Sequence, residues 1–153
     1  MIIDTIAQQA ELKGLAFVGT GDVFHPRWFN SIKAELEEVA EGTFEHPRYR
    51  TRFILTVEVE DKHRVHHLIF LPTLTTVESV REELAKHSND IDVDGRARVD
   101  LGAPEIVDIA AAHDCLIGPS HAFTPWTSMY KEFDSLRACY GDRASDVKFL
   151  ELG

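Results

Sequence analysis

The chain alternates helical patterns with short apolar runs, and this alternation constrains its fold more than any other feature. Apolar residues recur at helical spacing over 4–13, 26–41, 75–87, 104–113 and 128–140. Strand-like runs lie between them at 15–19, 53–60, 65–71, 115–117 and 147–151. Strands separated by helices indicate a mostly parallel sheet with right-handed crossovers. Because a closed barrel of this type needs about eight strands, the roughly five strands predict an α/β fold that is only part of a barrel.

One pair of strands is joined too closely for a crossover. The run 53–60 alternates in its last part, so Glu58 and Glu60 point to the same side of the strand. The polar link Asp61–Arg64 then leads directly into a strand over 65–71. Such a link suits a β-hairpin.

Charge and cysteine content narrow the classes of function. The formal net charge of -10 argues against a general nucleic-acid-coating surface. It does not exclude a nucleic-acid enzyme, because clustered carboxylates and histidines also hold metal ions. Cys115 and Cys139 are far apart in the sequence and predict free thiols, which fits a cytoplasmic protein. No apolar run approaches the ~20 residues that cross a bilayer, so no membrane partner is expected.

A histidine follows the apolar run 115–117 in the segment Gly118–Trp126. α/β barrels keep their chemistry just past the ends of such strands. Gly118, Pro119 and Pro125 impose an irregular backbone around His121, which an ordinary strand-to-helix turn does not need. The alternative interpretation is a packed loop histidine beside a structural tryptophan.

Four strand ends each carry a potential metal ligand: Asp22, Glu58, His67 and His121. In a parallel barrel these ends converge on one face. Mixed histidine and carboxylate ligands suit zinc, manganese or iron, and a carboxylate such as Glu58 can bridge two ions. His66 and His67 are adjacent and face opposite sides of their strand. We expect His67 to face the site, with His66 structural or supporting a ligand, and we expect catalytic roles for Glu58, His121 and Asp22.

Two other loops resemble known binding motifs only in part. The run Asp90–Gly95 resembles a calcium loop, but Leu101 stands where that loop has its glutamate. The segment Gly19–Asp22 lacks the third glycine of a dinucleotide loop and the lysine of a P-loop. A solvated acidic loop and an ordinary turn are therefore the better interpretations.

Several segments together resemble the PHP (polymerase and histidinol phosphatase) domain, and more closely the endonuclease Q family. They are Val18-Gly19-Thr20-Gly21-Asp22, Glu58-Val59-Glu60-Asp61, Arg64-Val65-His66-His67, Ala103-Pro104-Glu105, His121-Ala122-Phe123-Thr124-Pro125-Trp126 and Phe149-Leu150-Glu151. The resemblance implies a distorted (β/α)7 barrel with up to three divalent ions, such as zinc, manganese or magnesium. It implies Glu58 as a bridging carboxylate, and His67 and His121 as ligands. Asp22 falls where many PHP proteins have a histidine.

The resemblance also implies an activity and a partner. The family nicks damaged DNA on the 5′ side of deaminated bases (uracil, hypoxanthine and xanthine) and at abasic sites. The alternatives are a catalytically inactive PHP remnant that acts as a binding module, or a PHP phosphatase acting on a small phosphate monoester.

The chain departs from the family pattern at both ends. The family's His-x-His pair does not precede Asp4, and its Asp-x-His motif would lie beyond Gly153. We therefore expect residues 1–153 to form a single truncated PHP-like domain that lacks the first strand and the C-terminal part. Unpaired strand edges would then favour self-association or a complementing chain.

Overall fold

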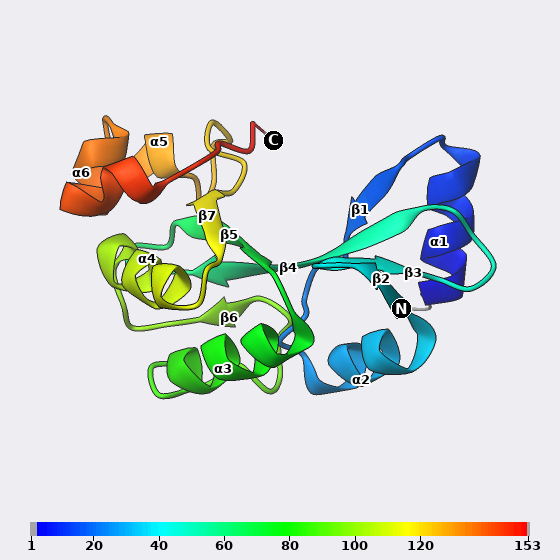
Figure 1. Cartoon of the computed structure of the whole chain (residues 1–153). Helices are drawn as coiled ribbons and strands as arrows, with labels where there is room; N and C mark the ends of the chain where they lie inside the picture. The colour runs from blue at the N-terminus through cyan, green and yellow to red at the C-terminus, as the bar shows by residue number, and fades with distance from the viewer. Residues whose placement is uncertain (1–2, 153) are drawn as a thin grey trace.

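A nine-residue strand, β4 (Arg52–Glu60), forms the axis of the computed structural model, which describes residues 3–152 (Figure 1). The other strands are β1 (Phe17–Gly19), β2 (Glu37–Ala40), β3 (Thr43–Glu45), β5 (His66–Leu71), β6 (Ala97–Arg98) and β7 (Leu116–Pro119). The helices are α1 (Ile3–Leu12), α2 (Pro26–Glu35), α3 (Leu74–Ala85), α4 (Ala103–Ala112), α5 (Met129–Glu132) and α6 (Leu136–Tyr140), followed by a 3-10 turn (Gly141–Asp146). The first half of β4 pairs with β1 and β3, and its second half pairs with β5 and β6.

The predicted mostly parallel sheet is wrong. The strands form a curled sheet in the order β2-β3-β4-β5-β7, and every pairing along that path is antiparallel. Within the described residues, only β1 and β6 run parallel to β4. The reason lies in the connections: β2–β3 and β4–β5 are joined by tight turns, whereas a parallel crossover needs about a dozen residues or more.

The helix predicted over 26–41 divides into a helix and a hairpin. α2 begins at Pro26 and buries Trp28, Phe29 and Ile32, but it ends at Glu35. The next residues form β2 and turn back into β3. Gly42 has a φ of 66°, so it supplies the left-handed residue of this turn rather than a helix cap.

The predicted hairpin between β4 and β5 is confirmed. The backbone N–H of Asp61 donates to the carbonyl of Val65 at 2.9 Å, which closes a three-residue loop. Arg64 ends that loop with a φ of 68°, the left-handed conformation typical of such hairpins. Glu60 therefore lies opposite His66, and Val59 lies opposite His67.

The C-terminal part differs from the prediction in two ways. The helix expected over 128–140 is two short helices, α5 and α6, and the strand expected over 147–151 has no strand assignment. This segment nevertheless lies along the edge of β7, where Lys148 N donates to Ile117 O at 3.4 Å and Glu151 N to Pro119 O at 3.1 Å. The β7 edge is thus covered rather than open, and nothing in the structure supports self-association through it.

Alternation along β4 separates the core from the site. Phe53, Leu55, Val57 and Val59 are buried on one face of the strand. Glu58 and Glu60 project from the other face of its second half. α1 and α2 lie around the β1–β3 end of the sheet, and α3 and α4 around its β5–β7 end (Figure 1). Among residues 3–152, no helix has both the length and the apolar character that a membrane span requires.

Candidate metal centre

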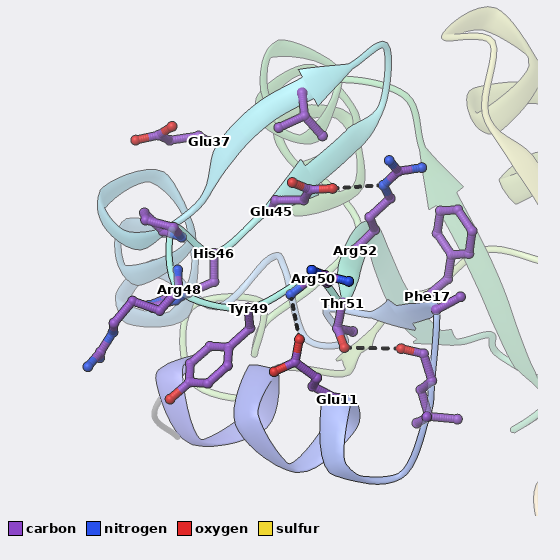
Figure 2. A pocket seen from close by; sticks show the side chains of 15 residues that line it. Glu11, Phe17, Glu37, Glu45, His46, Arg48, Tyr49, Arg50, Thr51 and Arg52 are labelled. Atoms are coloured by element: carbon purple, nitrogen blue, oxygen red, sulfur yellow. Dashed lines mark hydrogen bonds and ion pairs between the residues drawn. The ribbon is translucent and has the colours of Figure 1, made fainter.

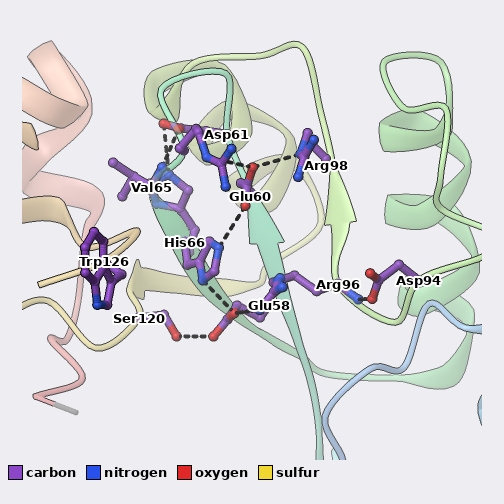
Figure 3. A network of polar contacts seen from close by, with 12 residues as sticks. Glu58, Glu60, Asp61, Val65, His66, Asp94, Arg96, Arg98, Ser120 and Trp126 are labelled. Carbon is purple, nitrogen blue, oxygen red and sulfur yellow. Dashed lines mark hydrogen bonds and ion pairs between the residues drawn. The ribbon is translucent and has the colours of Figure 1, made fainter. Parts of the chain in front are cut away.

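Three side chains from three strands meet at one end of the curled sheet: Glu58 on β4, His66 on β5 and His121 just after β7. Glu58 Oε1 lies 2.9 Å from His66 Nδ1, and His66 Nδ1 lies 3.0 Å from His121 Nε2. Glu58 Oε2 lies 3.7 Å from His121 Nε2. Figure 3 shows Glu58 and His66 at the centre of a wider polar network. The curvature of the sheet therefore gathers residues that are far apart in the sequence.

Both ring nitrogens of His66 face carboxylates. Nε2 lies 3.0 Å from Glu60 Oε2 and Nδ1 lies 2.9 Å from Glu58 Oε1, and an ionised carboxylate only accepts hydrogen bonds. Glu60 therefore orients the ring through Nε2, and a cation bound at Nδ1 would displace the proton that faces Glu58. A histidine that donates its outer N–H to a carboxylate is the usual arrangement for a metal ligand.

His121 is oriented in the same way by Thr124. The Thr124 hydroxyl lies within donating distance of two carbonyls, His121 O at 3.0 Å and Trp126 O at 3.1 Å. A hydroxyl has one hydrogen, so Thr124 Oγ1 must accept from His121 Nδ1, which lies 2.9 Å away. His121 Nε2 then faces His66 Nδ1 at 3.0 Å.

These three groups fit a divalent cation. The Glu58 carboxylate, His66 Nδ1 and His121 Nε2 converge on one point, and a cation there would take the place of the ring protons between them. Ligand atoms about 2.1 Å from a tetrahedral ion lie about 3.4 Å apart, close to the spacings seen here. Three protein ligands also leave coordination positions for water or substrate, as in catalytic rather than structural sites.

The Glu58 carboxylate is held in its charged form. Burial alone raises its pKa, but hydrogen bonds from His66 and Ser120 and the charges of His66 and His121 lower the pKa to about 2. The Ser120 hydroxyl lies 2.7 Å from Glu58 Oε2 and 2.8 Å from Glu151 Oε2. Glu151 also accepts from the backbone N–H of His121 at 2.8 Å. The C-terminal segment therefore helps to position two of the three candidate metal ligands, Glu58 and His121.

Arginines surround the carboxylates from the other side. Arg96 Nη1 lies 3.4 Å from Glu58 Oε1, and Arg98 Nε lies 2.8 Å from Glu60 Oε1. Arg64 Nε lies 3.6 Å from the same Glu60 oxygen. These side chains remain largely exposed, so they place positive charge at the mouth of the site in a chain whose formal net charge is -10.

Two of the predicted site residues do not join the cluster. Asp22 lies in the loop after β1, where a side chain at Gly95 would collide with it, and it lines a separate cavity of about 270 Å³. His67 faces the opposite side of β5 and is fully buried. There its Nε2 lies 3.2 Å from Asp61 Oδ2 and its Nδ1 lies 2.7 Å from the Tyr140 hydroxyl.

The structure brings His66 to the site where the sequence favoured His67, and the hairpin explains the exchange. A four-residue link over 61–64 would pair Glu60 with Val65 and put His67 opposite Glu58. The observed loop is closed by Asp61 and Val65, which shifts the register by one residue. Such a shift moves every side chain of a strand to the other face. This register depends on the left-handed conformation of Arg64, which its residue type does not indicate.

The largest cavity lies elsewhere, between α1 and residues 46–52, with a volume of about 980 Å³ (Figure 2). Its charges largely cancel: Arg48 pairs with Asp4, and Arg52 Nε lies 2.8 Å from Glu45 Oε1. Within the described residues, its lining includes no cluster with metal-ligand spacing. We therefore place the candidate site at Glu58 rather than in the largest cavity.

Comparison with known proteins identifies the class of this fold. No family model matches the chain. It is 49% identical to the lesion-specific endonuclease PfuEndoQ from Pyrococcus furiosus, whose crystal structure superposes with a TM-score of 0.93. A crystal structure of endonuclease Q in complex with a 27-mer duplex carrying an abasic lesion at the active site matches at 49% identity and a TM-score of 0.92. The fold is thus that found in DNA lesion endonucleases.

Over its whole length the chain is similar to endonuclease Q in sequence and fold. The matches cover 100% of this chain but 37% and 38% of the two solved chains, so it corresponds to little more than a third of them. It is also 42% identical over 133 residues to the uncharacterized protein MJ0043 of Methanocaldococcus jannaschii, covering 86% of this chain and 15% of that protein.

Proposed function

We propose that this chain carries the metal-binding part of a metal-dependent DNA endonuclease that nicks damaged strands. The observation that carries the proposal is the convergence of Glu58, His66 and His121, whose ligand atoms all lie within 4.8 Å of one another. The substrate classes are those that the family resemblance implies: DNA containing uracil, hypoxanthine or xanthine, cut on the 5′ side, and abasic sites. Support for a DNA partner comes from the related endonuclease Q, which has been solved with a lesion-containing duplex.

Each residue has a defined task in this proposal. Glu58, His66 and His121 hold the ion, which can be zinc, manganese or magnesium. Bound there, a divalent ion activates water and stabilises charge that develops on a phosphodiester. Glu60 keeps the His66 ring in the binding orientation.

Ser120 and Glu151 hold the Glu58 carboxylate and the His121 backbone in place. The arginines at the mouth supply positive charge toward the DNA backbone.

The proposal also assigns the chain to a PHP-type catalytic domain, residues 1–153 forming part of it. Further ligands, which the family resemblance places in His-x-His and Asp-x-His motifs, belong in this proposal to stretches of the relatives outside the match. We place the protein in the cytoplasm, a location supported by the free and buried thiols of Cys115 and Cys139.

The test combines metal titration with a nicking assay. The protein is stripped with a chelator, titrated with Mn²⁺ and with Zn²⁺ by calorimetry, and then incubated with duplexes containing one uracil or one hypoxanthine. Glu58→Gln should weaken metal binding by about 100-fold or more and abolish nicking, because it removes the anionic ligand. Glu45→Gln, at the far end of the sheet, is the matched control and should behave as wild type.

Two results would contradict the nuclease assignment. A wild-type protein that binds the ion but cuts no DNA would favour a binding module. Release of phosphate from small monoesters without nicking would favour a phosphatase. A third result would contradict the site and not the activity: nicking that survives Glu58→Gln would show that the active centre lies elsewhere.

A further inference from the structure

An exposed tryptophan, Trp126, lies beside the metal centre. Its loop is hydrogen-bonded to both histidines of that centre. Trp126 is 74% exposed, whereas Trp28, the other tryptophan of the chain, is 7% exposed. Trp126 is the most exposed of the aromatic side chains among the described residues, and it lies next to Phe123, which is 59% exposed. The neighbouring Phe123 already stacks on Tyr130, with ring centroids 4.7 Å apart and planes 11° from parallel. Among the described residues, no such ring partner is recorded for Trp126.

The backbone around Trp126 is fixed on both sides. On one side Thr124 binds the ring of His121, and its hydroxyl lies 3.1 Å from Trp126 O. On the other side Thr127 O accepts from the backbone N–H of His66 at 3.0 Å. The loop is therefore tied to both histidines of the metal centre.

The same loop is conformationally strained. His121 and Thr127 have φ values of 33° and 53°, and a left-handed β-branched residue such as Thr127 is costly. Strain of this kind persists where the surrounding structure imposes it, often at ligand-binding sites. Here the two left-handed residues flank the turn that carries Trp126, whose indole is exposed.

The surroundings indicate which ligand the indole would meet. Figure 3 shows Trp126 on one side of His66 and Glu58, and Arg96 and Arg98 on the other. A flat apolar ring, a cation site and a pair of guanidinium groups thus follow one another across the opening of the site. A nucleotide has matching groups in the same order: the π-face of its base at one end and its anionic phosphates at the other.

We infer that Trp126 is a stacking platform for a nucleobase of the strand whose phosphodiester reaches the metal centre. The inference rests on the proposed nuclease function, because it names where a base of that substrate lies. Aromatic side chains bind unpaired bases through their π-faces, and enzymes that act on damaged DNA commonly present an unstacked nucleotide to the site. The base would lie on the Trp126 side, with the phosphates directed toward Arg96 and Arg98.

Fluorescence tests the inference directly, because the chain has only two tryptophans. In a Trp28→Phe background the emission comes from Trp126 alone. It is titrated with a short single-stranded oligothymidylate, and with an equally long oligomer of abasic sites that carries the same charge but no bases. We expect saturable quenching by the first and none by the second, with both titrations made in chelator so that neither oligomer is cut.

Binding of the oligothymidylate to unlabelled protein gives a second readout that does not depend on Trp28. Trp126→Ala should weaken binding by roughly tenfold or more, the loss typical of one stacked base, and Trp126→Phe should recover part of it. Phe17→Ala, which removes an exposed aromatic at the β1 end of the sheet, should change nothing.

The inference would be overturned by equal quenching from both oligomers, or by unchanged binding in Trp126→Ala. A blue shift of the Trp126 emission that grows with protein concentration would instead assign the surface to a second copy of the chain. Base-dependent quenching in a protein that never nicks DNA would retain the stacking platform while removing the nuclease function.

Discussion

Two adjacent histidines on β5, His66 and His67, lie in two different polar clusters. His66 faces the open end of the sheet, where Glu58, His121 and the arginines gather. His67 faces the interior and is fully buried between Asp61 and Tyr140. Each ring is paired with a carboxylate from the β4–β5 hairpin, so proximity to a carboxylate does not distinguish them.

The difference lies in which groups the Nδ1 atom of each ring faces. His67 donates from Nε2 to Asp61 and accepts at Nδ1 from the Tyr140 hydroxyl, so its two nitrogens are satisfied. Burial raises the pKa of Tyr140, with smaller contributions from Cys139 and Asp61, which keeps the phenol as a donor. His66 pairs with Glu60 through Nε2, and its Nδ1 faces Glu58 and His121, the other two candidate ligands. A histidine held between core partners stabilises the fold, and one that faces other ligand atoms can bind a cation.

The largest expected effects come from removing either ring. His66→Ala should weaken Mn²⁺ or Zn²⁺ binding by about 100-fold or more, because one of three ligands is lost. Its free energy of unfolding without metal should fall as well, because His66 is buried and the buried Glu60 carboxylate loses its histidine partner. His67→Ala should keep the metal affinity, but it leaves a buried carboxylate and hydroxyl without a partner and opens a cavity, at about 3–5 kcal/mol.

Calorimetric metal titration and urea unfolding of His66→Ala and His67→Ala check the roles assigned to the two histidines. If His67→Ala lost the metal while remaining as stable as wild type, the assignment of the two centres would be reversed. His46→Ala, in the distant 46–52 segment, is a control for nonspecific loss of a histidine.

A smaller effect is expected from the residue that orients His66. Glu60→Gln keeps the shape of the side chain but removes the charge that fixes Nε2 as the N–H. Changes to such supporting carboxylates typically cost about 10- to 100-fold in metal affinity. A Glu60→Gln variant with wild-type affinity would show that the hydrogen bond does not select the tautomer. Glu105→Gln, a helix-capping carboxylate on α4, is the matched control.

Part of this comparison could be predicted from the sequence. Alternation along β4 puts Glu58 and Glu60 on one face, and adjacency puts His66 and His67 on opposite faces, as the structure has them. The strand end followed by His121 also marked a position that the structure brings into the cluster. Which of the two β5 histidines shares a face with Glu58 depends on hairpin register. That register was set by a left-handed Arg64, a conformation unusual for a residue other than glycine.

The sheet itself could not be predicted in this way, because helix-strand alternation specifies elements and not their neighbours. The pattern at 36–41 continues the helical spacing of α2, yet pairing with β3 makes it a strand. Here tertiary pairing overrides local propensity. β7 returns antiparallel to β5 even though α3, β6 and α4 lie between them in the sequence. That path follows from the curl of the whole sheet, to which single segments give no guide.

The smallest expected effect comes from removing one oxygen atom beside the buried His67. Tyr140→Phe removes the hydroxyl that donates to His67 Nδ1 and leaves the ring in place. Losing one buried hydrogen bond of this kind should lower the free energy of unfolding by about 1–2 kcal/mol, with the denaturant dependence unchanged. Tyr49→Phe, on the half-buried loop before β4, should stay within about 0.5 kcal/mol of wild type. Because Tyr140 touches His67 and not His66, metal affinity should be unaffected. A parallel loss of metal affinity in Tyr140→Phe would mean that the two faces of β5 are coupled and that the histidine centres act as one.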